Sequence, residues 1–139
     1  MRRTQAGQTL VMFAVTLTFL FVGLIALVGD ADLMMVEYSR VNSAALIGVQ
    51  AGTTAVDLDE FYQGRRSLDA FQAKTRCESA AVAALAQYGG GNANCVPQGT
   101  QVTATVSKAV NLPIPMFGPG ATVSVTRSGR AVFGGTTPQ

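Results

Sequence analysis

The chain has 139 residues, the length of one domain with room for an appended segment. Hydrophobic residues make up 48% of it and charged residues only 13%, against about 25% charged residues in an ordinary soluble domain. The net charge is +2 and no basic block follows the first three residues, so the electrostatic signature of nucleic-acid binding is missing. The sequence has no histidine, which removes the commonest general base at neutral pH and the commonest metal ligand.

A short basic leader, residues 1–7, precedes an uncharged apolar run from Leu10 to Val28. As an α-helix this run covers roughly 29 Å, which matches the hydrocarbon core of a bilayer. The leader carries two arginines, whereas Asp30 and Asp32 mark the far boundary of the run. Because positive flanks stay in the cytoplasm, the sequence predicts a single-pass protein of the inner membrane with a cytoplasmic N-terminus and an extracytoplasmic head.

A removed secretory signal is the first alternative for this run. Signal peptides have an apolar region of ~7–15 residues that ends at an A-x-A-like site. The best cleavage candidate ends at Ala31, with the unfavourable Asp30 beside the cut. We therefore expect a retained membrane helix, and a secreted soluble protein is the alternative.

One long helix is predicted over residues 8–54, because no proline interrupts the chain after the span and its first glycine beyond Asp30 is Gly48. Small residues recur at four-residue spacing and form a narrow face, consisting of Ala44, Ala45, Gly48 and Gly52. Such a face permits close helix packing. It packs either on the chain's own head or on identical or related helices in an assembly, and both alternatives stay open.

Two charged stretches follow the span. Glu37 and Arg40 are one helical turn apart, so they can pair with each other or serve a neighbouring subunit. The stretch 57–67 is predicted to be a connector, and its acidic residues Asp57, Asp59 and Glu60 lack the loop spacing of a calcium motif. We expect a solvated acidic turn and no metal site.

Residues 55–139 are predicted to form an α+β head that begins with one further helix. Ser67 is expected to cap this helix, and Gly89 to end it with a left-handed residue. Its expected apolar positions are Leu68, Phe71, Val82 and Leu85.

The two cysteines of the chain, Cys77 and Cys95, are expected to form a disulfide in an exported domain. Closing that loop stabilises the fold by ~3 kcal/mol. Helical phase places Cys77 away from the face of Leu68 and Phe71, so the bridge is expected to fasten the "GGGNANC" loop over the outer flank of the helix. Two unpaired buried thiols are the alternative.

The hydrophobic period changes to two from Thr100 onward, which indicates strands. Residues 121–127 alternate again, a short strand is expected over residues 130–134, and the proline-rich segment 112–120 cannot continue a central strand. The apolar positions of the first strand are Val102, Ala104, Val106, Val110 and Leu112. We therefore predict a roughly three-stranded antiparallel sheet that packs on the upper part of the long helix.

The order of basic leader, Gly7, apolar span, closing Asp30 and the run "VNSAALIGVQAGT" at residues 41–53 resembles the TadE/TadG-like proteins of Tad (Flp) pilus systems, which belong to the type IV pilin class. The Val-Thr strands and the "LPIP" crossover resemble the same family. The resemblance implies cleavage by a prepilin peptidase between Gly7 and Gln8. It also implies other pilin-like subunits and the pilus assembly machinery as partners.

Two positions depart from the family pattern. Leu46 stands where the family has a second Asp, and Met12 stands where pilins carry a Glu that pairs with a neighbour's N-terminus. The missing Glu at Met12 favours a minor or initiating subunit over a bulk one.

No residue set for nucleophilic catalysis is present, and "GGGNANC" lacks the Lys and Ser/Thr of a phosphate loop. We therefore expect a non-catalytic structural subunit without cofactors. The alternative is a membrane-anchored binding module that never enters a filament.

Overall fold

A computed structural model describes residues 4–111 and 120–133 of the chain. The fold is α+β, with a long N-terminal helix, further helices and a three-stranded antiparallel sheet in the order β1-β2-β3, and this confirms the predicted pilin-like layout. The elements are α1 (Thr4–Thr53), α2 (Leu58–Tyr62), α3 (Ala70–Ala86), β1 (Asn92–Gln98), β2 (Gln101–Val110) and β3 (Ala121–Arg130).

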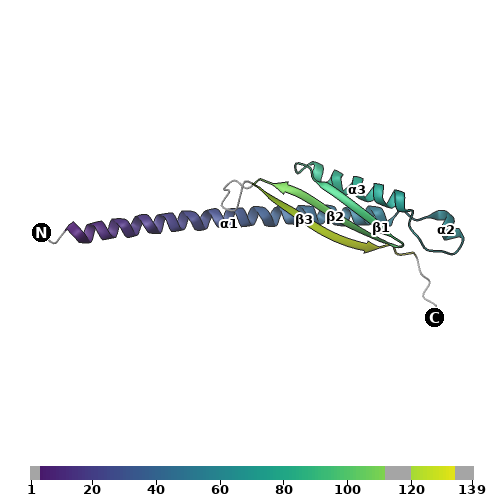
Figure 1. The fold of residues 1–139 in the computed structure, drawn as a ribbon, viewed down its shortest axis with the longest axis horizontal. Coiled ribbons are helices and arrows are strands. Elements are labelled where there is room, and N and C mark those ends of the chain that lie inside the picture. The colour runs from purple at the N-terminus through teal and green to yellow at the C-terminus, as the bar shows by residue number, and fades with distance from the viewer. Residues whose placement is uncertain (1–3, 112–119, 134–139) are drawn as a thin grey trace, which may run out of the picture.

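Helix α1 is one uninterrupted rod of 50 residues. Its first half projects alone from the molecule, and its second half lies under the sheet and beside α3 (Figure 1). The hydroxyls of Thr16 and Thr18 each donate to a backbone carbonyl one turn back, at 2.9 and 2.8 Å. Both hydroxyl groups therefore have a hydrogen-bond acceptor inside the apolar run. The sequence predicts this helix over residues 8–54, close to the observed limits.

The connector predicted over residues 57–67 contains the short helix α2. The Asp57 carboxylate caps it and accepts from the backbone N–H groups of Asp59 and Glu60. Asp57 thus stabilises the start of the helix, which gives this acidic residue a local structural role. The head therefore has two further helices, where the sequence predicts one.

Helix α3 begins later than predicted, and its buried face is a different one. Asp69 caps it by accepting from the Gln72 N–H at 3.0 Å, so the assignment of the cap to Ser67 is wrong. Phe71 is 80% exposed and Val82 is 41% exposed, so neither belongs to the core face. The buried positions follow a strict four-residue spacing at Ala73, Cys77, Ala81 and Leu85. The predicted end is close to the observed one, because α3 ends at Ala86 with Gln87 as its C-cap, and Gly89, two residues further on, has a φ of +93°.

The sheet contains a strand that the sequence pattern does not predict. β1 has two asparagines and a proline, which are poor strand formers, but as an edge strand it tolerates Pro97. Gly99 and Thr100 form the tight turn that joins it to β2, with Gly99 at a φ of +59°. The expected strand over residues 130–134 is wrong, because β3 continues through Gly129 and ends at Arg130. The crossover residues 112–119, Leu112 included, lie outside the described part.

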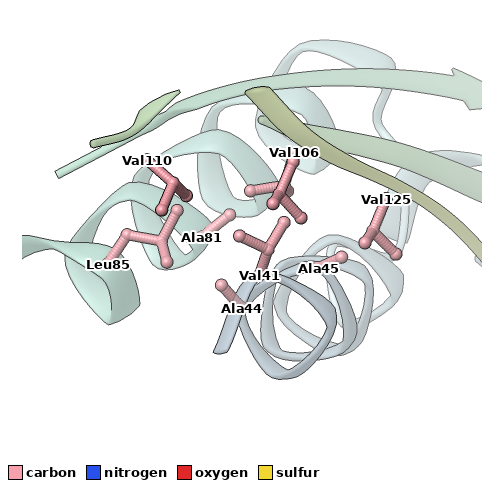
Figure 2. Packing of buried hydrophobic residues seen from close by; sticks show 9 residues of the cluster. Val41, Ala44, Ala45, Ala81, Leu85, Val106, Val110 and Val125 are labelled. Carbon is pink, nitrogen blue, oxygen red and sulfur yellow. The ribbon is translucent and has the colours of Figure 1, made fainter. Parts of the chain in front are cut away.

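The core of the head lies where α1, α3 and the inner face of the sheet meet. Figure 2 shows Val41, Ala44 and Ala45 of α1 pointing toward the side chains of α3 and of the strands. Alternate residues of β2 face inward, as predicted, at Val102, Ala104, Val106 and Val110. The second half of α1 is therefore a core element of the head and continuous with the span.

Candidate functional site

The projecting half of α1 is apolar on every side. From Gln8 to Gly29 no residue is buried, and the large apolar side chains are open to their surroundings, Phe19 for example at 76% exposure. In the described part of the chain this is the one helix long and apolar enough to cross a membrane. A helix that is apolar on every side needs an apolar environment. The first half of α1 is therefore a single membrane anchor near the N-terminus. Gly7 and Gln8 lie within α1, and Met1 to Arg3 lie outside the described residues.

The small-residue face of α1 packs on the chain's own head. Ala44 and Ala45 are 1% and 0% exposed. A Cβ added at Gly48 meets the Cys77 carbonyl oxygen at 2.9 Å and the Ala81 Cβ at 3.0 Å. A Cβ added at Gly52 meets the Cys77 Cβ at 3.0 Å. Of the two alternatives for this face, packing within the subunit is the one observed, and the face is closed to neighbouring copies while the head is folded.

The disulfide between Cys77 and Cys95 is present, with a Cα–Cα distance of 6.2 Å. Its position differs from the prediction, because Cys77 lies on the inner face of α3 and Cys95 lies in β1, at 0% and 1% exposure. The predicted helical phase rests on large apolar residues, and one of these, Phe71, lies on the exposed face of α3. The contact with α1 selects small side chains instead, since α3 approaches the glycines closely. The bridge therefore joins helix and sheet across the core.

A buried ion pair ties α1 to the sheet. The Lys108 Nζ donates to Glu37 Oε2 at 2.5 Å, and Arg40 donates to Glu37 Oε1 at 2.6 Å, as expected for the one-turn pair. Arg40 also lies over the Tyr88 ring at 4.6 Å. The hydrogen bond from Lys108 lowers the pKa of Glu37, against the opposing effect of burial. Sequence reasoning missed Lys108, although its even spacing from Val106 and Val110 places it on the inward face.

The two residues predicted at the membrane boundary have different surroundings. Asp32 is exposed, but Asp30 is only 6% exposed. Neither carboxylate oxygen of Asp30 has a hydrogen-bond partner within the described structure. A buried carboxylate without a donor is costly, so it needs a functional or structural reason.

The acidic turn near α2 shows no arrangement for a metal. Asp57 caps α2, and Glu60 forms an ion pair with Arg65. Among the described residues no group of three or more His, Cys, Asp or Glu side chains is placed to hold a metal ion. A hollow of about 480 Å³ lies beside Asp57, Asp59 and Asp69.

The chain matches no protein-family model, no curated protein and no solved structure.

Proposed function

We propose that the protein is a non-catalytic, pilin-like structural subunit, of minor abundance, in a Tad-type pilus or a related envelope assembly. The observation that carries the proposal is the continuity of α1, which is both the membrane-length apolar segment and a core element of the head. A head fixed to its span in this way moves as one rigid body. Such a body can leave the bilayer along the helix axis without unfolding.

The proposed subunit sits in the inner membrane with its N-terminus in the cytoplasm and its head outside. The asymmetry between the basic leader and the acidic residues after the span supports this orientation. A buried disulfide in the head supports an oxidising compartment. A prepilin peptidase would cut between Gly7 and Gln8. The intact mass of the extracted protein tests the cut, and a chain starting at Met1 or Ala31 contradicts it.

Assembly contacts must use a face of α1 other than the small-residue face. On the head-bearing half of α1 the exposed residues include Ser43, Leu46, Ile47 and Gln50, and none of them is charged. An uncharged outer face on a helix is unusual for a solvent-facing surface and suits helix–helix contact. Adjacent positions then have different roles: Gly48 serves the fold of the head, and Ile47, at 46% exposure, serves assembly.

Surface filaments sheared from producing cells test the proposal. Stoichiometric amounts of the chain in the sheared fraction indicate a bulk subunit, and small defined amounts indicate a minor one. Ile47→Glu should remove the chain from this fraction while the head stays folded, as shown by a reduction-resistant disulfide at Cys77. Complete retention of the wild-type chain in the membrane contradicts the proposal and favours the membrane-anchored binding module.

A further inference from the structure

The disulfide of the head is enclosed by α1, α3, β1 and β2. Cys77 lies in α3 and Cys95 in β1, and they are 0% and 1% exposed. Ala104 of β2 pairs with Cys95 across the sheet, and α1 lies beside α3 (Figure 1). A Cβ added at Gly48 of α1 would lie 3.5 Å from the Cys77 Sγ. The backbone of α1 therefore packs directly against a sulfur of the bond.

Of these four elements, α1 is the one that is distant in sequence from the bond. Helix α3 and strands β1 and β2 follow one another within residues 70–110. Helix α1 ends at Thr53, and the connector that contains α2 separates it from them. Elements that are close in sequence meet sooner, because closing a short loop costs less entropy. The unit of α3, β1 and β2 therefore brings the two cysteines together without α1.

Formation of the bond needs space that the closed head does not have. Thiol–disulfide exchange proceeds through a mixed disulfide with an external disulfide. One cysteine thiolate attacks a sulfur of the external disulfide and releases its first thiolate. The second cysteine thiolate then attacks the mixed disulfide, closes the bond between Cys77 and Cys95, and releases the second thiolate. Two electrons pass to the external disulfide, and its two thiolates take up the two protons. The intermediate thus carries an external group on a sulfur that is fully buried in the closed head.

The approach to the sulfurs along the edge of β1 is closed by α3 itself. The backbone N–H of Cys95 donates to Glu78 Oε1 at 3.3 Å, which fastens the edge of β1 to α3. Since α3 and β1 are the two elements that the bond joins, opening this edge would move the two cysteines apart. An external group reaches the sulfurs, with both cysteines still adjacent, when α1 is displaced.

We propose that residues 41–53 of α1 are a cover over the disulfide, and that they dock only after exchange with an external disulfide has formed the bond. The docked cover then protects the bond from thiols. This order places an oxidation by thiol–disulfide exchange before the step that joins the head to its span. The inference goes beyond the proposed function and does not depend on it, because every group involved lies within one chain.

The structure offers a place where α1 can be tied to the sheet. The Cβ of Val49 lies 3.9 Å from a Cβ added at Gly129 of β3, within the range of about 3.5–4.5 Å that a disulfide requires. Val49→Cys also removes the methyl group that would meet the new Cβ. Val49→Cys combined with Gly129→Cys therefore gives a full chain in which a second disulfide, the tie, holds the cover in place. Intact mass shows that both bonds are formed.

The order of reduction in this tied chain tests the cover. Dithiothreitol is raised stepwise in detergent until the first bond opens, and peptide masses after alkylation identify it. A species with the tie reduced and the bond between Cys77 and Cys95 intact should accumulate, and the reverse species should be absent. The matched control, Val49→Ser with Gly129→Ser, cannot be tied, and its native bond should be reduced at least roughly tenfold faster than in the tied chain. A native bond that opens before the tie, or equal rates with and without the tie, overturns the inference.

Two single substitutions test the order of formation and the route of access, and they decide the question if the tie does not form. Gly52→Leu should hold the cover away, because a Cβ there meets the Cys77 Cβ at 3.0 Å and the Ala73 carbonyl oxygen at 3.1 Å. The isolated variant should carry the native bond but lose it to dithiothreitol at least roughly tenfold faster than the wild type. Glu78→Gln, at the edge of β1, should be reduced at the wild-type rate.

Three results of this comparison contradict the inference. Free thiols in the isolated Gly52→Leu chain would show that the bond forms only against a docked α1. A bond that stays protected in this variant would show that α1 is not the cover. Rapid reduction of Glu78→Gln would show that thiols enter at the edge of β1. If Gly52→Leu does not accumulate in the membrane, the tied chain decides the inference by its order of reduction.

Discussion

The closest contact between α1 and α3 gives the sharpest prediction. Gly48→Ala and Gly48→Leu should destabilise the head, whereas Gly29→Ala and Gly29→Leu in the same helix should not. A Cβ at Gly29 has no atom within 4 Å. A Cβ at Gly48 meets a backbone oxygen at 2.9 Å, and backbone cannot rotate away as a flexible side chain does. Helix α3 cannot yield freely either, because the disulfide holds it to β1.

The magnitude follows from two opposing effects. Replacing a helical glycine by alanine gains about 1 kcal/mol in helix propensity. Overpacking a close contact costs about 1–3 kcal/mol, and the further carbons of leucine add to it. We expect a net loss of about 1 kcal/mol for Gly48→Ala and about 3 kcal/mol for Gly48→Leu. At Gly29 the head should keep its stability.

Access to the buried disulfide measures the opening of the head. The fraction of Cys77 and Cys95 that becomes reducible and alkylated is followed against urea in detergent, where α1 keeps its apolar half covered. With a slope of roughly 1–2 kcal/mol per molar urea, Gly48→Leu should lower the midpoint by roughly 1.5–3 M. Equal urea midpoints for the substitutions at Gly48 and Gly29 would refute the reasoning. They would show that the space between α1 and α3 at Gly48 accommodates a larger side chain without loss of stability.

Three other variants test the buried ion pair, the disulfide and the membrane span. Lys108→Met should cost about 2–3 kcal/mol at neutral pH, because it leaves the buried Glu37 with Arg40 alone. Since the pKa of Glu37 is lowered in the fold, the stabilisation is present above the unfolded pKa of about 4.3 and is lost as pH falls through the folded value, so the urea midpoints of wild type and variant should converge in acid. Replacing Cys77 and Cys95 by serine should cost about 3 kcal/mol, measured by near-ultraviolet circular dichroism on heating. Val22→Arg at the middle of the apolar run should oppose insertion by about 2.5–3.5 kcal/mol and shift the chain out of the membrane fraction; unchanged partition would contradict the membrane assignment.

Residue patterns predict the long helix, the inward face of β2 and the α+β layout, because each rests on a strong periodic signal. The apolar run needs no partner to be helical in lipid, and the alternation in β2 fixes its inward residues. The end of α3 follows from the glycines that come after it, Gly89 and Gly90. These features depend on local chemistry, which a sequence carries directly.

The features that the sequence predicts wrongly are those that depend on which other element packs against them. The residues of β1, Pro97 among them, favour irregular structure over a strand. β1 is a strand because it pairs with β2. Phe71 is exposed because α3 turns its small residues toward α1, where a ring has no room. The spacing of Lys108 from Val106 and Val110 indicates an inward position, but its charge favours an outward one until Glu37 is placed against it. Asp30 gives no signal of burial in the sequence, because its surroundings come from the fold.

The small-residue face connects these corrections to function. A stripe of glycine and alanine on a membrane helix normally suggests contact between copies, but here it is filled by α3 and the sheet of the same chain. The close approach makes head and span one rigid unit, since any rotation of the head about α1 would drive Ala81 or Cys77 into the helix backbone. In the proposed assembly, contacts between copies form at the exposed face of α1. A subunit built in this way transmits a pull on its span directly to the head, which a head on a flexible linker would not do.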